Sequence, residues 1–127
     1  VRTLLQEVRN RRETCSGTVN NVTLVLHPFR WQDINLTSFK ADAIFHDPFD
    51  PTVNPDCWTQ GIFSWYQTCL ADSGRVATYS AAGHIRRAMR DAGLFVAKAH
   101  GFGQKREMTI AALNEASLAP YPLKYRP

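Results

Sequence analysis

The sequence has few cysteines and no long run of apolar residues. Its 127 residues include three cysteines, Cys15, Cys57 and Cys69. Their number is odd, and no two stand at a spacing typical of a metal site or a disulfide, so we expect reduced thiols in a cytoplasmic protein. No apolar segment approaches the length of a membrane span and no signal peptide opens the chain, so no membrane partner is expected.

Common catalytic combinations are also missing. No Cys–His pair or Ser–His–Asp set stands out, and we expect His84 and His100 to lie at element ends without a catalytic role. His46, Asp50 and Asp56 could in principle bind a divalent ion, but the prolines between them break any regular spacing of ligands. The sequence therefore predicts no metal site.

The composition is that of a folded, moderately basic domain. Hydrophobic residues make up 44% of the chain and aromatic residues 11%, which is enough for a core. The formal net charge is +4. Solubility alone explains such an excess, but it also favours a polyanionic partner such as RNA.

Strand-like and helix-like segments alternate along the chain. We expect an initial helix that contains Val1 to Val8, a loop at Ser16-Gly17, at most one helical turn within 29–40, and an irregular tail over 120–127. The expected strands and later helices are, in order, strands 22–26 and 41–45, a helix over 58–70, strand 75–79, a helix over 85–92, and strands 94–98 and 106–112. The helix over 58–70 is expected to end at Asp72-Ser73-Gly74. This order predicts an α/β fold with a mostly parallel sheet and an antiparallel last strand.

The most informative segment follows the strand over 41–45, which is apolar on both faces apart from Asp42, as buried parallel strands are. Two prolines, Pro48 and Pro51, force the chain to leave the sheet at His46-Asp47. Ligands of open α/β sheets bind where strands end at their carboxyl side. We therefore expect Asp47 to hold a polar group of a substrate, although an acid here also suits a cap of the loop or of the next helix.

Four motifs in matching order resemble one family. They are Asp42-Ala43-Ile44-Phe45-His46-Asp47-Pro48-Phe49, Asn54-Pro55-Asp56-Cys57-Trp58-Thr59, Arg75-Val76-Ala77-Thr78-Tyr79-Ser80-Ala81-Ala82-Gly83 and Gly101-Phe102-Gly103-Gln104-Lys105-Arg106-Glu107-Met108. The chain resembles the S-adenosyl-L-methionine (SAM)-dependent methyltransferases that finish 5-methylaminomethyl-2-thiouridine at the tRNA wobble position (MnmC-type).

The resemblance implies a Rossmann-like class I methyltransferase fold. It covers residues 22–112 and leaves an irregular tail, 113–127, so residues 1–127 are expected to form a single partial domain. The glycine-rich turn and the ribose-binding acid of such folds are absent from the sequence, which indicates the carboxyl-terminal part of a domain whose amino-terminal half is missing. Unpaired sheet edges would follow, so we expect the piece to self-associate or to come from a longer chain.

The resemblance also implies roles for individual residues. Asp47 is expected to be catalytic, and Pro48 and Phe49 to lie beside the SAM cofactor; His27, which stands where the family tends to carry Gly-Asp, is the candidate for the adenine end. Lys105, Arg106, Arg86 and Arg87 are the basic candidates for tRNA contacts, although Arg86 and Arg87 also suit a solvent-facing helix face and Lys105-Arg106 a turn between two strands. Trp58 is expected among the core residues on the inner face of its helix, and as the aromatic nearest the Asp47 loop it is also a candidate contact for the ligand or RNA. Two alternatives stay open: a methyltransferase for another amine, and a non-catalytic RNA-binding remnant.

Overall fold

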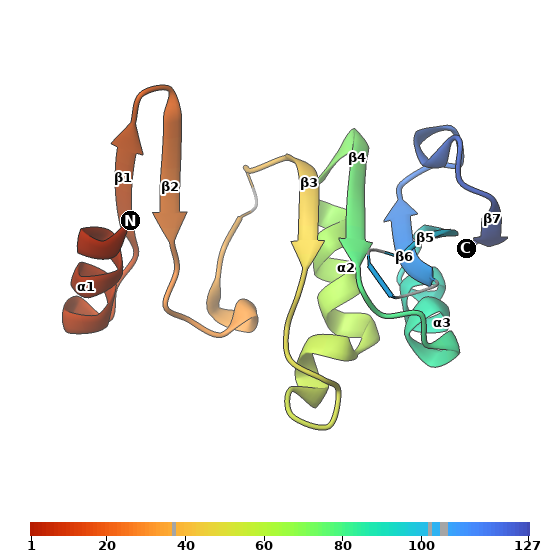
Figure 1. Ribbon diagram of the computed structural model, residues 1–127, viewed down its shortest axis with the longest axis horizontal. Coiled ribbons are helices and arrows are strands. Elements are labelled where there is room, and N and C mark those ends of the chain that lie inside the picture. Colours follow the sequence, from red (N-terminus) through yellow and green to blue (C-terminus); the bar gives the residue numbers. More distant parts are fainter. Residues whose placement is uncertain (37, 102, 105–106) are drawn as a thin grey trace. The chain divides into compact units, whose positions relative to one another are not determined.

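The computed structural model describes residues 1–36, 38–101, 103–104 and 107–127. The chain forms two compact units, Val1–Asn35 and Leu36–Pro127, each described here by itself. Figure 1 shows their helices and strands.

The first unit consists of a helix and a hairpin. Helix α1 spans Arg2–Arg11. Strands β1 (Cys15–Val19) and β2 (Val22–Leu26) pair antiparallel in a two-stranded sheet, and a 3-10 turn, η1, follows at Trp31–Asp33. The hairpin turns at Asn20, whose φ of 54° lies in the left-handed region that asparagine tolerates.

Two predictions for this unit are confirmed and one is wrong. The helix and the strand over 22–26 are present, but Ser16-Gly17 belongs to β1 and not to a loop. Gly17 pairs with Leu24 across the hairpin, so cross-strand hydrogen bonding overrides the weak local preference of serine and glycine for strands.

The second unit is built on a five-stranded sheet in the order β3-β4-β6-β5-β7. Its strands are β3 (Ala41–His46), β4 (Leu70–Thr78), β5 (Phe95–His100), β6 (Glu107–Ala112) and β7 (Leu123–Tyr125). Strand β6 is antiparallel to both β4 and β5, so β3, β4 and β5 run in one direction and β6 and β7 in the other. The predicted antiparallel last strand, β6, is thus inserted between two strands of the opposite direction. The prediction of a mostly parallel sheet is wrong for the described residues, because β3 with β4 is the one parallel pairing and the other three pairings are antiparallel.

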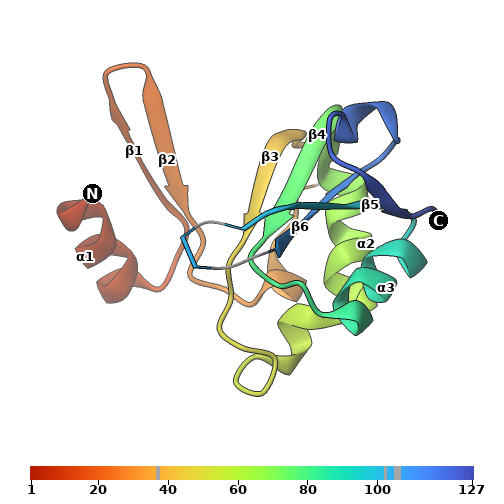
Figure 2. The same ribbon diagram turned by 45° about the vertical axis from the view of Figure 1, so that its right-hand side comes forward.

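Helices cover one face of this sheet. After the short helix η2 (Pro55–Trp58), α2 (Gln60–Cys69) and α3 (Gly83–Asp91) lie side by side on that face, as Figures 1 and 2 show. The core between these layers is made of fully buried side chains; they include Phe63, Val76, Ile85, Met89 and Val96. The opposite face of β5 and β6 is covered by η3 (Ala116–Leu118), whose Leu118 packs with Ala97, Ile110 and Ala112.

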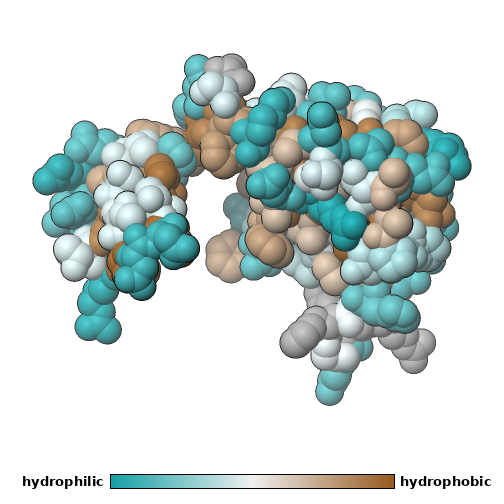
Figure 3. Space-filling model, turned by 90° about the horizontal axis from the view of Figure 1, so that it is seen from above, coloured by the Kyte–Doolittle hydropathy of each residue, from teal (hydrophilic) through white to brown (hydrophobic). Residues whose placement is uncertain are grey.

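Strand β3 differs from its prediction. Its alternate side chains do not all lie in a core: Phe45 is 83% exposed, while His46 next to it is 2% exposed. The reason is its place at one end of the sheet, where α2 covers one face and the described part of the second unit leaves the other open. In the view of Figure 3, hydrophobic residues lie on the surface among hydrophilic ones.

Two further boundaries are corrected. Helix α2 ends at Cys69, and Asp72-Ser73-Gly74 lies inside β4. A β-carbon on Gly74 would stand 2.5 Å from the carbonyl oxygen of Ala41, so glycine permits the close approach of β3 where the register shifts. The tail is not wholly irregular, because β7 pairs with β5.

Candidate active site at the carboxyl ends of β3 and β4

Parallel strands β3 and β4 end at the same edge of the sheet, with His46 opposite Thr78 in register. Beyond this edge lies a cavity of about 330 Å³. Its lining residues are Phe45, His46, Asp47, Ala77, Thr78, Tyr79, Gly101 and Met108. The point where the chain leaves β3, at His46-Asp47, therefore lines a cavity, as expected for the carboxyl edge of an α/β sheet.

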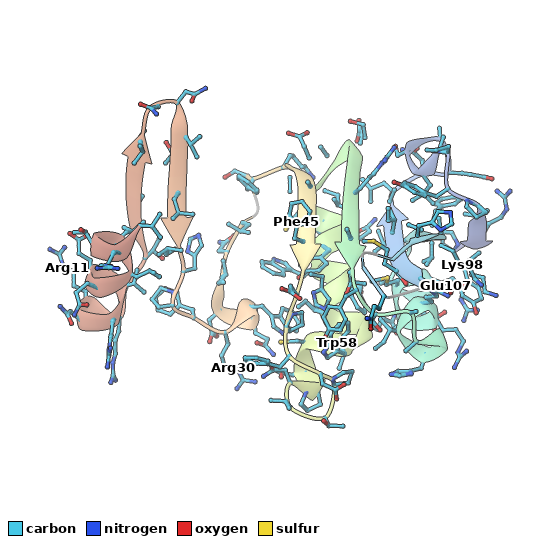
Figure 4. The ribbon with its side chains drawn as sticks, in the orientation of Figure 1. Arg11, Arg30, Phe45, Trp58, Lys98 and Glu107 are labelled. Atoms are coloured by element: carbon cyan, nitrogen blue, oxygen red, sulfur yellow. The ribbon has the colours of Figure 1, made fainter. Side chains whose placement is uncertain are left out.

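The wall of this cavity is mainly apolar, with one carboxylate. Phe45, Ala77 and Met108 supply the apolar side, and Asp47 is exposed beside them. A carboxylate at an apolar opening can accept a hydrogen bond from an amine and hold its nitrogen in one orientation. Figure 4 shows Phe45 on β3, and Trp58 near the loop that leaves this strand.

Two aromatic side chains hold the backbone that follows Asp47. The Tyr79 hydroxyl donates a hydrogen bond to the carbonyl oxygen of Pro48 at 3.0 Å, and the Trp58 indole Nε1 donates to that of Phe49 at 2.8 Å. The Phe49 ring is 75% exposed and is not among the cavity-lining residues. The carbonyl groups of Pro48 and Phe49 thus hold the loop beside the cavity, and contact of these two residues with SAM stays a prediction.

Trp58 lies in the core, as expected from its helical stripe, and not at a surface where it could contact RNA. It is 5% exposed, and its ring lies 4.6 Å from that of His46 and 5.6 Å from that of Tyr79, both edge to face. A buried indole has little surface left for a nucleic acid, so Trp58 supports the loop from inside.

His46 anchors the end of β3 in an aromatic core. Its Nδ1 lies 2.8 Å from the Tyr66 hydroxyl, and the rings of Trp58 and Phe63 pack against it. Burial lowers the pKa of His46 to about 4, although the Cys57 backbone and the charge of Asp47 act in the opposite direction. The imidazole is therefore neutral at physiological pH.

The Asp50 carboxylate stabilises the turn in which it lies. Its Oδ1 accepts hydrogen bonds from the Thr52 backbone amide at 2.9 Å and from the Thr52 hydroxyl at 2.8 Å. These bonds lower the pKa of Asp50. Across the described parts of the chain, no group of three or more His, Cys, Asp or Glu side chains could hold a metal ion.

The prediction that Arg86 lies on a solvent-facing helix face is wrong. Arg86 is 4% exposed, and its guanidinium donates to the Thr109 hydroxyl at 2.9 Å and to Glu107 at 3.3 Å. Glu107 also pairs with Lys98 at 3.0 Å, and these two lie next to each other in Figure 4. A guanidinium held in this way has no free side for phosphate, so Arg86 ties α3 to β6.

The remaining predicted residues are scattered. Arg87, the next residue of α3, is exposed and remains a candidate for phosphate contacts. His27 belongs to the first unit, where its Nδ1 lies 2.9 Å from the Thr14 hydroxyl. Lys105 and Arg106 lie outside the described residues.

Sequence reasoning placed Tyr66 in the core but gave no role in the site to Tyr79, Tyr66 or Met108. Tyr79 could have been found, because it follows the adjacent strand and so reaches the same sheet edge as Asp47. Tyr66 and Met108 give no such signal, since their roles depend on how the helix and the inserted strand pack.

The described residues fit part of the expected cofactor. The SAM sulfonium is a cation, and cations are attracted by carboxylates and by aromatic faces. The cavity offers Asp47 together with the rings of Phe45 and Tyr79. These residues suit the sulfonium end of SAM, while His27 stays a prediction for the adenine end. In the described part of the chain, no helix is long and apolar enough to cross a membrane.

Comparison with known protein families gives a match over most of the chain. The sequence model of a family described as S-adenosyl-L-methionine-dependent methyltransferase matches residues 3–114. This match extends through both units and confirms the resemblance and the predicted cofactor.

Curated relatives and a solved structure point to the same family. The chain is 49% identical over 97 residues to the tRNA 5-methylaminomethyl-2-thiouridine biosynthesis bifunctional protein MnmC of Hahella chejuensis (strain KCTC 2396), covering 76% of this chain and 16% of that protein. It is 47% identical over 75 residues to the protein of the same name from Ralstonia nicotianae (strain ATCC BAA-1114 / GMI1000), covering 59% of this chain and 11% of that protein. The structure of MNMC2 from Aquifex aeolicus matches with a TM-score of 0.56 and 32% identity, over 65% of this chain and 27% of that one. The chain thus spans about a sixth or less of the length of these curated relatives.

Proposed function

Because the chain belongs to the family of S-adenosyl-L-methionine-dependent methyltransferases, we propose that it contributes the amine-handling edge of an enzyme that methylates the aminomethyl group of a tRNA wobble uridine. The observation that carries this proposal is the position of Asp47: an exposed carboxylate on an apolar cavity at the shared carboxyl edge of β3 and β4. The names of the MnmC relatives support the choice of tRNA as substrate.

In direct methyl transfer from SAM to an amine, no covalent bond forms between the substrate and the protein. SAM, when bound, supplies a methyl group on a sulfonium, so a carbon–nitrogen bond forms as the carbon–sulfur bond breaks. The amine must be neutral and in line with the methyl group, and positioning of this kind accounts for much of the acceleration of a two-substrate reaction.

Asp47 performs the acid–base part. Its carboxylate accepts a hydrogen bond from the amine N–H, which directs the nitrogen lone pair toward the methyl group. The proton that the nitrogen loses on methylation passes to the same carboxylate, or through it to water. Phe45 and Met108 supply apolar wall beside this carboxylate, which limits the water around the amine.

Binding of the RNA is assigned to basic side chains. Arg87 is exposed on α3, and Lys105-Arg106 directly precede Glu107, the first residue of β6, in the sequence. Contacts of this type go to phosphates and position the RNA without reading its sequence.

The direct test is methyl transfer from isotope-labelled SAM by the protein that carries this chain. The acceptors are tRNA that lacks the final wobble methyl group and, as the matched control, the same tRNA after methylation. Nucleoside mass spectrometry should place one labelled methyl group on the exocyclic nitrogen of the first tRNA and none on the second. Label on a small amine but not on tRNA would favour a different amine methyltransferase, and RNA binding without transfer to any amine would favour a non-catalytic remnant.

A further inference from the structure

We propose that Tyr79 is a positioning residue that sets the orientation of Asp47 by holding the backbone of the Asp47–Phe49 turn. This inference rests on the proposed function, in which the Asp47 carboxylate meets the amine. Neither the family resemblance nor the sequence motifs assign a role to the Tyr79 hydroxyl.

Two successive carbonyl groups after Asp47 are held by side chains from separate elements. Pro48 accepts a hydrogen bond from the Tyr79 hydroxyl at 3.0 Å, and Phe49 accepts one from Trp58 Nε1 at 2.8 Å. Tyr79 directly follows β4, while Trp58 belongs to η2. Two fixed carbonyls on successive residues fix the peptide planes, and hence the path, of the turn after Asp47.

The chain before Asp47 is also held. His46 is 2% exposed, and its Nδ1 is paired with the Tyr66 hydroxyl at 2.8 Å. Asp47 is thus an exposed residue between a buried neighbour on one side and two bonded carbonyls on the other. A side chain on so constrained a backbone loses few degrees of freedom when its substrate binds, which is the requirement for a positioned general base.

The paired ends of β3 and β4 bring Tyr79 to the same sheet edge as Asp47. Register places His46 opposite Thr78, so Asp47 and Tyr79 are the first residues beyond the ends of two paired parallel strands. The hydrogen bond from Tyr79 therefore continues the link between β3 and β4 after the ladder has ended. Tyr79 also lines the cavity, and its ring meets that of Trp58 edge to face with 5.6 Å between the ring centroids, so both donors belong to one aromatic cluster.

The protonation state of Tyr79 is consistent with this role. Burial, and then the negative charges of Asp50 and Asp47, raise the pKa of the Tyr79 hydroxyl. The hydroxyl therefore stays protonated and can donate throughout the neutral and mildly alkaline range.

The test compares Tyr79→Phe with Tyr121→Phe in the protein that carries this chain. Tyr79→Phe removes the hydroxyl and keeps the ring against Trp58; Tyr121→Phe removes a hydroxyl from the segment that packs on the opposite sheet face of β5 and β6. Two quantities are measured: deuterium uptake of the peptide over 47–58, and the kcat and KM of methyl transfer to tRNA.

We expect Tyr79→Phe to raise deuterium uptake in the 47–58 peptide and to lower kcat about tenfold, the effect of one lost hydrogen bond, with KM for tRNA nearly unchanged. Tyr121→Phe should change neither quantity. Trp58→Phe, which removes the second donor, should raise uptake of the same peptide and so provides a second probe of the turn.

Unchanged uptake in Tyr79→Phe would overturn the proposed restraint of the turn. Raised uptake with an unchanged kcat would overturn the positioning role while leaving the proposed function intact. Absence of transfer to tRNA by the unaltered protein would overturn the proposed function and, with it, the role of Tyr79 in catalysis; the two failures are therefore distinguishable.

Discussion

His46 and Asp47 are neighbours in the chain and opposites in environment. The imidazole is 2% exposed among Trp58, Phe63 and Tyr66, while the carboxylate next to it is exposed on the cavity. This difference arises because successive side chains of an extended chain point to opposite faces of the sheet. One residue therefore fixes the end of the strand, and the next is presented to a ligand.

The buried imidazole predicts a pH-dependent stability. The pKa of His46 is lowered from 6.5 to about 4 in the folded chain, so protonation favours the unfolded state. The contribution of the neutral imidazole is fully present above pH 6.5 and is lost as the pH falls toward about 4. The free energy of unfolding should drop over this range by up to about 3 kcal/mol from this group.

Urea unfolding at a series of pH values measures this effect. His46→Gln removes the titrating ring, so the difference in unfolding free energy between the original protein and this variant should change with pH between about 6.5 and 4. His84→Gln, on the exposed surface of α3, is the matched control and should leave the pH dependence as it was. A difference for His46→Gln that is constant with pH would show that the imidazole is not held neutral.

Only some of the residues of the candidate site could be predicted from the sequence. The prolines after Asp47 and the apolar strand before it were enough to locate the carboxyl edge. The core position of Trp58 was predicted from its helical stripe, whereas the burial of Arg86 was missed. Arginine is common at RNA interfaces, and which face of α3 is buried depends on tertiary packing. The hydroxyl of Tyr79 was missed because its partner is a backbone carbonyl of a loop that only the fold brings near.

At the scale of elements, α3 is attached to β6 through one buried charge. Arg86 bonds the Thr109 hydroxyl, the Met108 carbonyl and Glu107, and Thr109 in turn donates to the carbonyl of Ser80 at 2.6 Å. The chain just after β4 is thereby held to the inserted strand. This network orients the turn that leads from the candidate site into α3.

We expect Arg86→Leu to lower the free energy of unfolding by about 2–3 kcal/mol, because the buried Thr109 and Met108 oxygens lose their donor. Arg87→Leu, one residue further on the same helix and exposed, should change it by less than about 0.5 kcal/mol. Urea denaturation of both variants at neutral pH measures the two values. Equal effects would contradict the assignment of Arg86 as the residue that ties the two elements together.

The elements themselves were predictable where they are long and periodic. Helix α3 and strands β3, β4, β5 and β6 have clear patterns, and Gly93, with a φ of 91°, ends the helix as expected. Strands β1 and β7 were not predicted. Their sequences have little strand preference, and they exist because β2 and β5 present hydrogen-bonding edges to them.

At the scale of the whole molecule, the family match and the division into two units differ in how they group the residues of the chain. The match over residues 3–114 runs through both units, whereas the contacts group residues 1–35 and 36–127 separately. The expectation of a single partial domain over 1–127 therefore stays a prediction. So does the expectation that its amino-terminal half is missing.

The open face of β3 predicts self-association of the isolated chain. Phe45 is 83% exposed on a strand that forms one end of the described sheet. Exposed apolar edge strands pair with other chains, and lysine on such a strand opposes pairing. Sedimentation velocity should show a mass that rises with concentration, and Phe45→Lys should shift the protein toward the monomer.

Val53→Lys provides the matched control for this experiment, since Val53 is 63% exposed but lies in the loop after β3. It should leave the association unchanged. If the unaltered chain were monomeric at all concentrations, association through this edge would be contradicted.

The central claim is that Asp47, at the end of β3, handles the amine in a SAM-dependent methyl transfer. The most direct measurement is the single-turnover rate of transfer from labelled SAM to tRNA for Asp47→Asn beside Asp50→Asn, a second acid of the same loop whose carboxylate bonds Thr52. The account predicts a loss of at least ~100-fold for Asp47→Asn, the size expected of a general base, and a rate close to the original for Asp50→Asn. Equal rates for Asp47→Asn and the unaltered protein would contradict it.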